Sequence, residues 1–161
     1  MTAGSGIVHA EVSPSAVLRD GGPCHLLQLW MNLPAALKGE TPAYHAVEPE
    51  DMAKLTGPGW SWEVISGKAE SEGAAAEGPV ASLTGLFTSR LKLEAGAVFS
   101  GHVPEGRTLL LYVVTGAVRL GDVELKPFTT PVFDRSGGTL DLTAEADTTL
   151  LWCHGDPIEE P

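Results

Sequence analysis

The residues of greatest chemical interest near the C-terminus are Cys153, His154 and Asp156. A thiol beside an imidazole and a carboxylate is the residue set of a nucleophile with its general base. On a strand, however, adjacent side chains point to opposite faces, so Cys153 and His154 would face away from each other. The sequence also shows no group that would stabilise an oxyanion. This spacing therefore argues against nucleophilic catalysis.

The two cysteines, Cys24 and Cys153, lie far apart in the sequence, each among apolar residues. They form neither a CxxC motif nor a spacing typical of metal ligands. We expect two reduced, buried cysteines in a cytoplasmic protein, with a long-range disulfide as the less favoured alternative. The glycines around Ser5 indicate a turn and not a phosphate-binding loop, because no strand precedes them and no Lys-Ser or Lys-Thr follows.

Composition excludes several classes of function. The chain has 161 residues, enough for one domain or for one domain and part of another. Its net charge of −11 argues against direct binding to nucleic acid or to an anionic membrane. The start of the sequence lacks the features of a signal peptide, and no apolar run has the length of a membrane span. We therefore expect a soluble, cytoplasmic protein.

The arrangement of apolar runs predicts an all-β fold. The chain combines 19 glycines and 12 prolines with 43% hydrophobic residues, which favours a folded, turn-rich β protein. Short runs separated by turn residues are typical of a sandwich or barrel. The predicted strands are residues 60–65, 83–93, 108–114, 117–120, 122–125, 130–133, 139–142 and 148–152.

Other segments connect these strands. Residues 26–31 are apolar and of strand length, which predicts a buried strand or a crossover between layers. Proline at the start and glycine at the end predict short helical turns at 34–39 and 49–55. The small, acidic residues 68–78 predict an exposed loop. Residues 110–120 predict a hairpin that turns at Gly116.

Trp60 and Trp62 lie two positions apart on a predicted strand and therefore share one of its faces. Two indole rings on one face favour packing in the core. The alternative is an aromatic patch that binds a partner.

Four stretches of the sequence resemble the pirin family of the cupin superfamily: residues 1–11, residues 27–34 with Pro42-Ala43-Tyr44, residues 111–118 and residues 155–161. The resemblance implies a cupin-type double-stranded β-helix, that is, a jelly-roll barrel, with short helical turns. It divides the chain into a remnant of a first cupin barrel (1–24), a connector with a crossover strand and short helices (25–58), and a second cupin barrel (59–161). On this interpretation the chain is a pirin shortened at both ends.

The resemblance also implies a metal site. Pirins hold a divalent transition metal through a His-x-His pair and a later His-x-Glu pair, and for this chain iron is the expected metal if the site is completed. His9 and Glu11 match the later pair, and residues two apart on a strand project from the same face and can meet one ion. The sequence contains no His-x-His. We therefore expect His9 and Glu11 to be metal ligands only if other residues complete the site; the alternative is an exposed N-terminal arm.

The second barrel offers few ligands of its own. The general cupin pattern places its ligands at Val103, Glu105 and Leu109, or, with a gap one residue longer, at His102, Pro104 and Leu109. At most one of these positions carries a suitable side chain. We expect a second barrel without metal and His102 in an exposed loop.

Three functions remain open. The first is a pirin-like module without catalysis of its own, which acts by interaction or regulation. The second is a metal-dependent oxidoreductase resembling quercetin 2,3-dioxygenase, with a flavonol-like substrate, if the metal site is completed. The third is a small-molecule pocket inside the second barrel. Open strand edges and apolar faces also predict a homo-oligomer, and a protein partner is a further expectation.

Overall fold

The structure, a computed structural model, describes residues 1–13 and 15–160. The chain divides into two compact units, one comprising Met1–His45 with the end of the chain and the other comprising Ala46–Glu159. Among the described residues, no helix is both long enough and apolar enough to cross a membrane.

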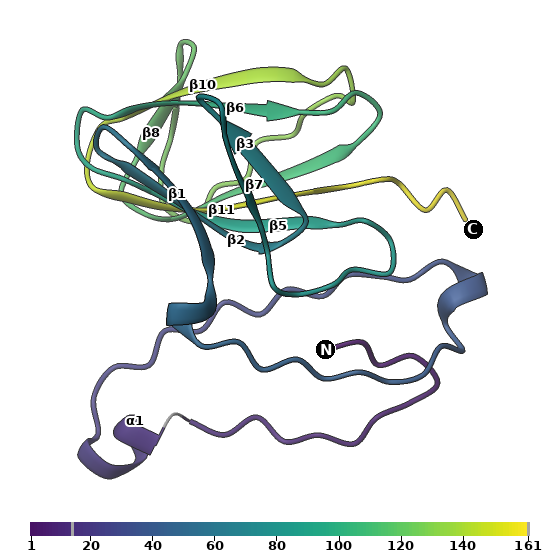
Figure 1. The fold of residues 1–161 in the computed structure, drawn as a ribbon. Helices are drawn as coiled ribbons and strands as arrows, with labels where there is room; N and C mark the ends of the chain where they lie inside the picture. The colour runs from purple at the N-terminus through teal and green to yellow at the C-terminus, as the bar shows by residue number, and fades with distance from the viewer. Residues whose placement is uncertain (14, 161) are drawn as a thin grey trace. The chain divides into compact units, whose positions relative to one another are not determined.

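The second unit is built from two antiparallel β-sheets (Figure 1). The five-stranded sheet has the order β1 (Ala53–Gly57), β2 (Trp60–Ser66), β5 (Phe87–Leu93), β11 (Thr148–Gly155), β7 (Thr108–Thr115). The four-stranded sheet has the order β6 (Val98–Val103), β10 (Gly138–Ala144), β8 (Val118–Leu120), β9 (Val123–Leu125). A separate hairpin pairs β3 (Lys68–Ser71) with β4 (Ala74–Glu77). The predicted all-β architecture is confirmed.

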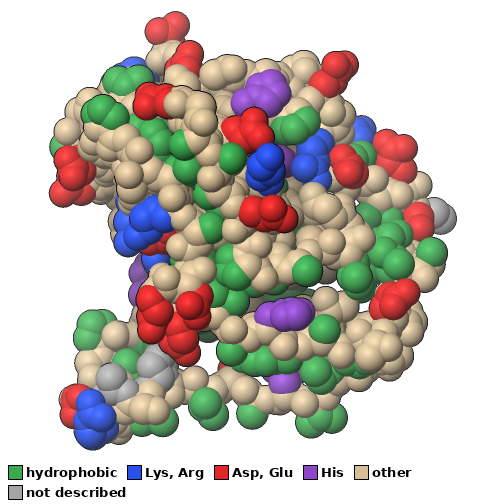
Figure 2. Space-filling model, in the orientation of Figure 1, with side chains coloured by type: hydrophobic (Ala, Val, Ile, Leu, Met, Phe, Trp, Pro, Cys, Tyr) green, Lys and Arg blue, Asp and Glu red, His purple; other side chains and the backbone are tan. Residues whose placement is uncertain are grey.

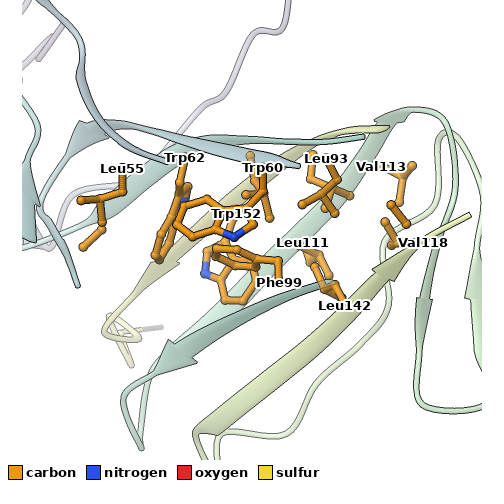
Figure 3. Packing of buried hydrophobic residues seen from close by; sticks show 14 of the residues in the cluster. Leu55, Trp60, Trp62, Leu93, Phe99, Leu111, Val113, Val118, Leu142 and Trp152 are labelled. Atoms are coloured by element: carbon orange, nitrogen blue, oxygen red, sulfur yellow. The ribbon is translucent and has the colours of Figure 1, made fainter. Parts of the chain in front are cut away.

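Aromatic side chains fill the space between the two sheets (Figure 3). Trp62 makes edge-to-face contacts with Phe87 and Phe99, with ring centroids 5.5 and 5.1 Å apart, and a tilted contact with Trp152 at 5.9 Å. The indole nitrogen of Trp62 donates a hydrogen bond of 2.8 Å to Ser89 Oγ, which in turn donates to the carbonyl oxygen of Trp152 at 2.7 Å. The expected core role of the two strand tryptophans is confirmed, because Trp60 and Trp62 are both buried.

The predicted hairpin at residues 110–120 is wrong. β7 pairs with β11 in one sheet, whereas β8 pairs with β10 and β9 in the other. The chain therefore crosses between the sheets at Gly116. This glycine has a φ of +77°, and a Cβ there would lie 2.3 Å from the carbonyl oxygen of Asp147. The turn residues were identified correctly, but their backbone geometry changes sheets and does not reverse the strand.

Two further predictions about the barrel need correction. Residues 68–78 form the β3–β4 hairpin and not a loop, and Ala69 is buried against the core. Residues 130–133 form no strand. The segment before them bonds to the edge of β7 only at Phe128 and Thr129, and the flanking Pro127 and Pro131 have no backbone N–H to continue a ladder.

The first unit contains little regular structure. It has one short helix, α1 (Ser15–Asp20), and one 3-10 turn, η1 (Ala35–Leu37), within the predicted helical turn at 34–39. Of the helical turn predicted at 49–55, only the 3-10 turn η2 (Pro49–Asp51) forms, because β1 begins at Ala53. The crossover strand predicted at residues 26–31 is wrong: this segment is extended and unpaired, and Trp30 is 86% exposed. An apolar run predicts burial, but no described side chain of residues 1–45 is buried.

Glu63 lies on the outer face of the five-stranded sheet with its side chain only 7% exposed. Strand register places Lys54 on one side of it and Arg90 on the other. Lys54 Nζ lies 3.1 Å and Lys92 Nζ 4.0 Å from its carboxylate, and Arg90 forms a close ion pair with it. Burial alone would raise the pKa of Glu63, but hydrogen bonds from Lys54 and Arg90 and the charges of Arg90 and Lys92 outweigh it and lower this pKa.

We expect Glu63→Gln to destabilise the barrel by about 1–2 kcal/mol, because three cations would then face one another without the carboxylate. The figure is modest because all three cations are about half exposed. Urea unfolding at neutral pH measures it. Glu124→Gln is the matched control, since Glu124 forms a single exposed ion pair with Lys126. Equal losses from the two variants would contradict a special role for the Glu63 cluster.

Candidate functional site

His9 and Glu11 lie on an extended segment of the first unit, outside any described strand. His9 Nε2 and Glu11 Oε1 are 4.0 Å apart, with side chains 40% and 61% exposed. Gln28 Nε2 donates a hydrogen bond of 2.9 Å to Glu11 Oε1. The extended backbone therefore brings the two side chains together on one side, as their spacing predicts, and Gln28 orients the carboxylate.

This pair fits part of a metal coordination sphere. Nitrogen and oxygen ligands bind divalent transition metals at about 2.0–2.2 Å, so neighbouring ligands of one ion lie about 3.0–3.5 Å apart. A small movement of the side chains would bring His9 Nε2 and Glu11 Oε1, now 4.0 Å apart, to this separation. Within residues 1–13 and 15–160, however, no group of three or more His, Cys, Asp or Glu side chains comes together. The described residues thus bring together two candidate ligands, fewer than the four that the pirin resemblance implies.

The ligand positions of the general cupin pattern lie around one end of the second barrel. Val103 is buried and Leu109 packs against the core, whereas Glu105 is exposed. His102 is exposed, as predicted, but it belongs to β6 and not to a loop. It alternates with the buried Val103, so its side chain lies on the outer face of the sheet.

His154 is an interior residue, which the sequence did not predict. It lies on β11, and its side chain shares the inward face of this strand with Leu150 and Trp152. His154 is 8% exposed. Its ring stacks on Phe87, with centroids 4.7 Å apart and planes inclined by 17°. Burial and the neighbouring positive charge of Arg107 lower the pKa of His154 to about 4. Period-two alternation along residues 150–154 is the signal that could have found it.

Cys153 and His154 do point to opposite faces of β11, as the sequence predicts. Burial raises the pKa of the Cys153 thiol to about 11, so it remains protonated and poorly nucleophilic near neutral pH. Both cysteines are free in the structure. The prediction that both are buried is wrong for Cys24, which is exposed because it lies in the extended first unit.

Two antiparallel sheets facing each other around an aromatic core define the second unit as a cupin-type β-barrel. A solved quercetin 2,3-dioxygenase from Acinetobacter baumannii matches 82% of this chain with a TM-score of 0.74 and 33% identity. Residues 88–161 match the pirin C-terminal cupin domain. The second unit is therefore similar to the C-terminal domain of the pirin family.

Curated relatives match over the whole chain. A pirin-like protein from Caulobacter vibrioides is 34% identical and human pirin is 30% identical, each over 100% of this chain. The chain spans about half the length of these relatives, namely 56% and 54%, and 46% of the A. baumannii protein. The similarity therefore includes the first unit, with His9 and Glu11, as well as the barrel.

Proposed function

We propose that this chain acts as a pirin-type interaction module and does not catalyse a reaction with its own residues alone. The observation that carries the proposal is the surface of the first unit. Large apolar side chains, green in Figure 2, are exposed along it, including Val8 at 101%, Leu26 at 69% and Trp30 at 86%. Exposed apolar surface of this extent is typical of a binding surface.

The proposed partner is a second copy of the chain, with the two first units covering each other's apolar side chains. The described residues 1–13 are joined to the rest of their unit by few hydrogen bonds: those between Thr2 and Ala43, one from Ser5 N to the carbonyl oxygen of Glu40, and one from Gln28 to Glu11. A segment with so little structure of its own can exchange between two copies at low energetic cost. The acidic balance of the chain is consistent with this proposal, because it disfavours nucleic acid as the alternative partner.

Light scattering after size exclusion is expected to give the mass of a dimer at micromolar concentrations. Trp30→Glu is expected to raise the dimer dissociation constant at least tenfold, since a buried interface tryptophan contributes about 2 kcal/mol or more. Val132→Glu is the matched control, because Val132 is 98% exposed but belongs to the barrel. A monomer throughout the micromolar range, or dissociation by Val132→Glu alone, would contradict the proposal.

A second candidate is a metal-dependent oxidoreductase. It is favoured by His9 and Glu11, whose side chains lie on one side of their segment, and by the similarity to a protein named quercetin 2,3-dioxygenase. A bound divalent metal, with iron favoured, would supply a Lewis acid and a redox centre for a flavonol-like substrate. His9 and Glu11 would bind the metal, Gln28 would orient Glu11, and residues of another chain or segment would complete the site.

Metal analysis after incubation with Fe²⁺ and desalting discriminates between the two candidates. The interaction module is expected to retain well below one equivalent of iron and to leave quercetin unconverted, because two ligands bind weakly. Stoichiometric iron that is lost in His9→Ala but kept in His45→Ala would overturn this expectation and support the oxidoreductase. His45 is the matched control because it is an exposed histidine of the same unit.

A further inference from the structure

One end of the barrel carries a polar cluster that neither candidate function uses. β5 and β7 begin at this end and β11 finishes there, and strand register places His154 between Phe87 and Leu109. The imidazole is covered on one face by the Phe87 ring. His154 is thus a polar side chain at the end of a largely apolar interior.

Two nitrogen atoms in this cluster lack hydrogen-bond partners. His154 Nδ1 and Arg107 Nε are both buried, and neither is hydrogen-bonded to any atom of the described residues. A buried polar atom without a partner is unfavourable, so such atoms are rare unless something else binds them. Both residues lie at the same end of the barrel, His154 near the end of β11 and Arg107 directly before β7.

Arg107 holds this end of the barrel together. It immediately precedes β7, and its Nη2 donates a hydrogen bond to the carbonyl oxygen of Gly85, just before β5. Its Nε lies 3.3 Å from Asp156 Oδ1, just after β11, without the geometry of a hydrogen bond. The Arg107 side chain is 16% exposed, whereas Asp156 is 73% exposed. A largely buried guanidinium therefore faces an exposed carboxylate, and water can hydrate that carboxylate in place of the ion pair.

We propose that Arg107 and His154 form a binding site for a small carboxylate, and that Asp156 occupies the guanidinium when no such ligand is bound. A planar guanidinium matches a carboxylate in shape and charge. In the tautomer protonated at Nδ1, the neutral imidazole donates a second hydrogen bond to the same ligand. Phe87 supplies an apolar wall for the rest of the molecule. The site uses no residue of the first unit and is independent of the proposed function.

The test is an NMR titration of the ¹⁵N,¹³C-labelled full chain with acetate as the probe. A titration with sodium chloride at equal ionic strength is the control. We expect saturable shifts of the His154 ring and Arg107 Nε resonances with acetate. Asp156→Asn is expected to bind acetate about threefold to fivefold more tightly, because it removes a competing carboxylate whose ion pair contributes up to about 1 kcal/mol. Arg107→Gln is expected to abolish the shifts, and Arg119→Gln, which breaks the ion pair with Glu145 elsewhere on the barrel, to leave them unchanged.

Three results would overturn the site. These are shifts that do not saturate, equal shifts with chloride, and unchanged or weaker acetate binding in Asp156→Asn. The last variant keeps Arg107 and its bond to Gly85, so it tests the site even if Arg107→Gln fails to fold.

Discussion

Trp62→Ala is expected to remove most of the stability of the barrel. Truncating a buried tryptophan costs about 3–5 kcal/mol, and domains of this size unfold with only about 5–15 kcal/mol. Trp62 should lie at the upper end of that range, because it contacts three aromatic rings and its loss leaves Ser89 Oγ without its donor. Chemical denaturation followed by far-UV circular dichroism measures the loss.

Two further variants separate the causes of this loss. Trp62→Phe keeps a ring in the core but removes the hydrogen bond to Ser89, and we expect it to cost about 1–2 kcal/mol. Phe128→Ala is the surface control, because Phe128 is 75% exposed, and it should change the free energy of unfolding by less than about 0.5 kcal/mol. A loss below about 2 kcal/mol for Trp62→Ala would show that the aromatic cluster is not the centre of the core.

Acidification from pH 6.5 to pH 4 is expected to destabilise the barrel by about 3 kcal/mol through His154 alone. The pKa of His154 is about 4 in the folded chain and 6.5 in an exposed histidine. Below pH 6.5 the unfolded chain therefore binds a proton that the folded chain excludes, and each pH unit lowers the stability by about 1.4 kcal/mol. Above pH 6.5 both states are neutral at this position, and the effect disappears.

The measurement compares variants, because carboxylates such as Glu63 also titrate in acid. His154→Gln is expected to be less stable than the wild type at pH 7, having lost the stack on Phe87, but to lose about 3 kcal/mol less on going to pH 4. His45→Gln should follow the wild type, since His45 is exposed and is not among the charges that shift the pKa of His154. Parallel stability curves for the wild type and His154→Gln would show that His154 does not exclude a proton.

The strands were largely predictable because alternation and turn residues are local signals. β2, β5, β7 and β11 fall where the apolar runs predict them. β6 was missed, because its small and polar residues Ser100, Gly101 and His102 weaken the alternation. Gly101 is required by packing, since a Cβ there would lie 2.6 Å from the Trp152 ring. That requirement comes from a strand far away in the sequence, so no local pattern contains it.

Of the two candidate sites, one could be predicted from the sequence and the other could not. The juxtaposition of His9 and Glu11 was predictable, because their relation depends only on an extended backbone over three residues. The cluster of His154, Phe87, Arg107 and Asp156 was not, because strand pairing between β5, β7 and β11 assembles it from three separate segments. The sequence pattern shows which residues share a face, but not which faces meet.

The sequence alone determined the all-β class, the acidic surface, the resemblance to the pirin family and the facing pair His9 and Glu11. It could do so because composition, alternation and short motifs are local properties. Only the tertiary structure decided that the chain changes sheets at Gly116, that residues 26–31 stay exposed and that His154 is buried beside Arg107. The physical reason is that burial depends on what packs against a segment, and the partners of these segments lie far from them in the sequence.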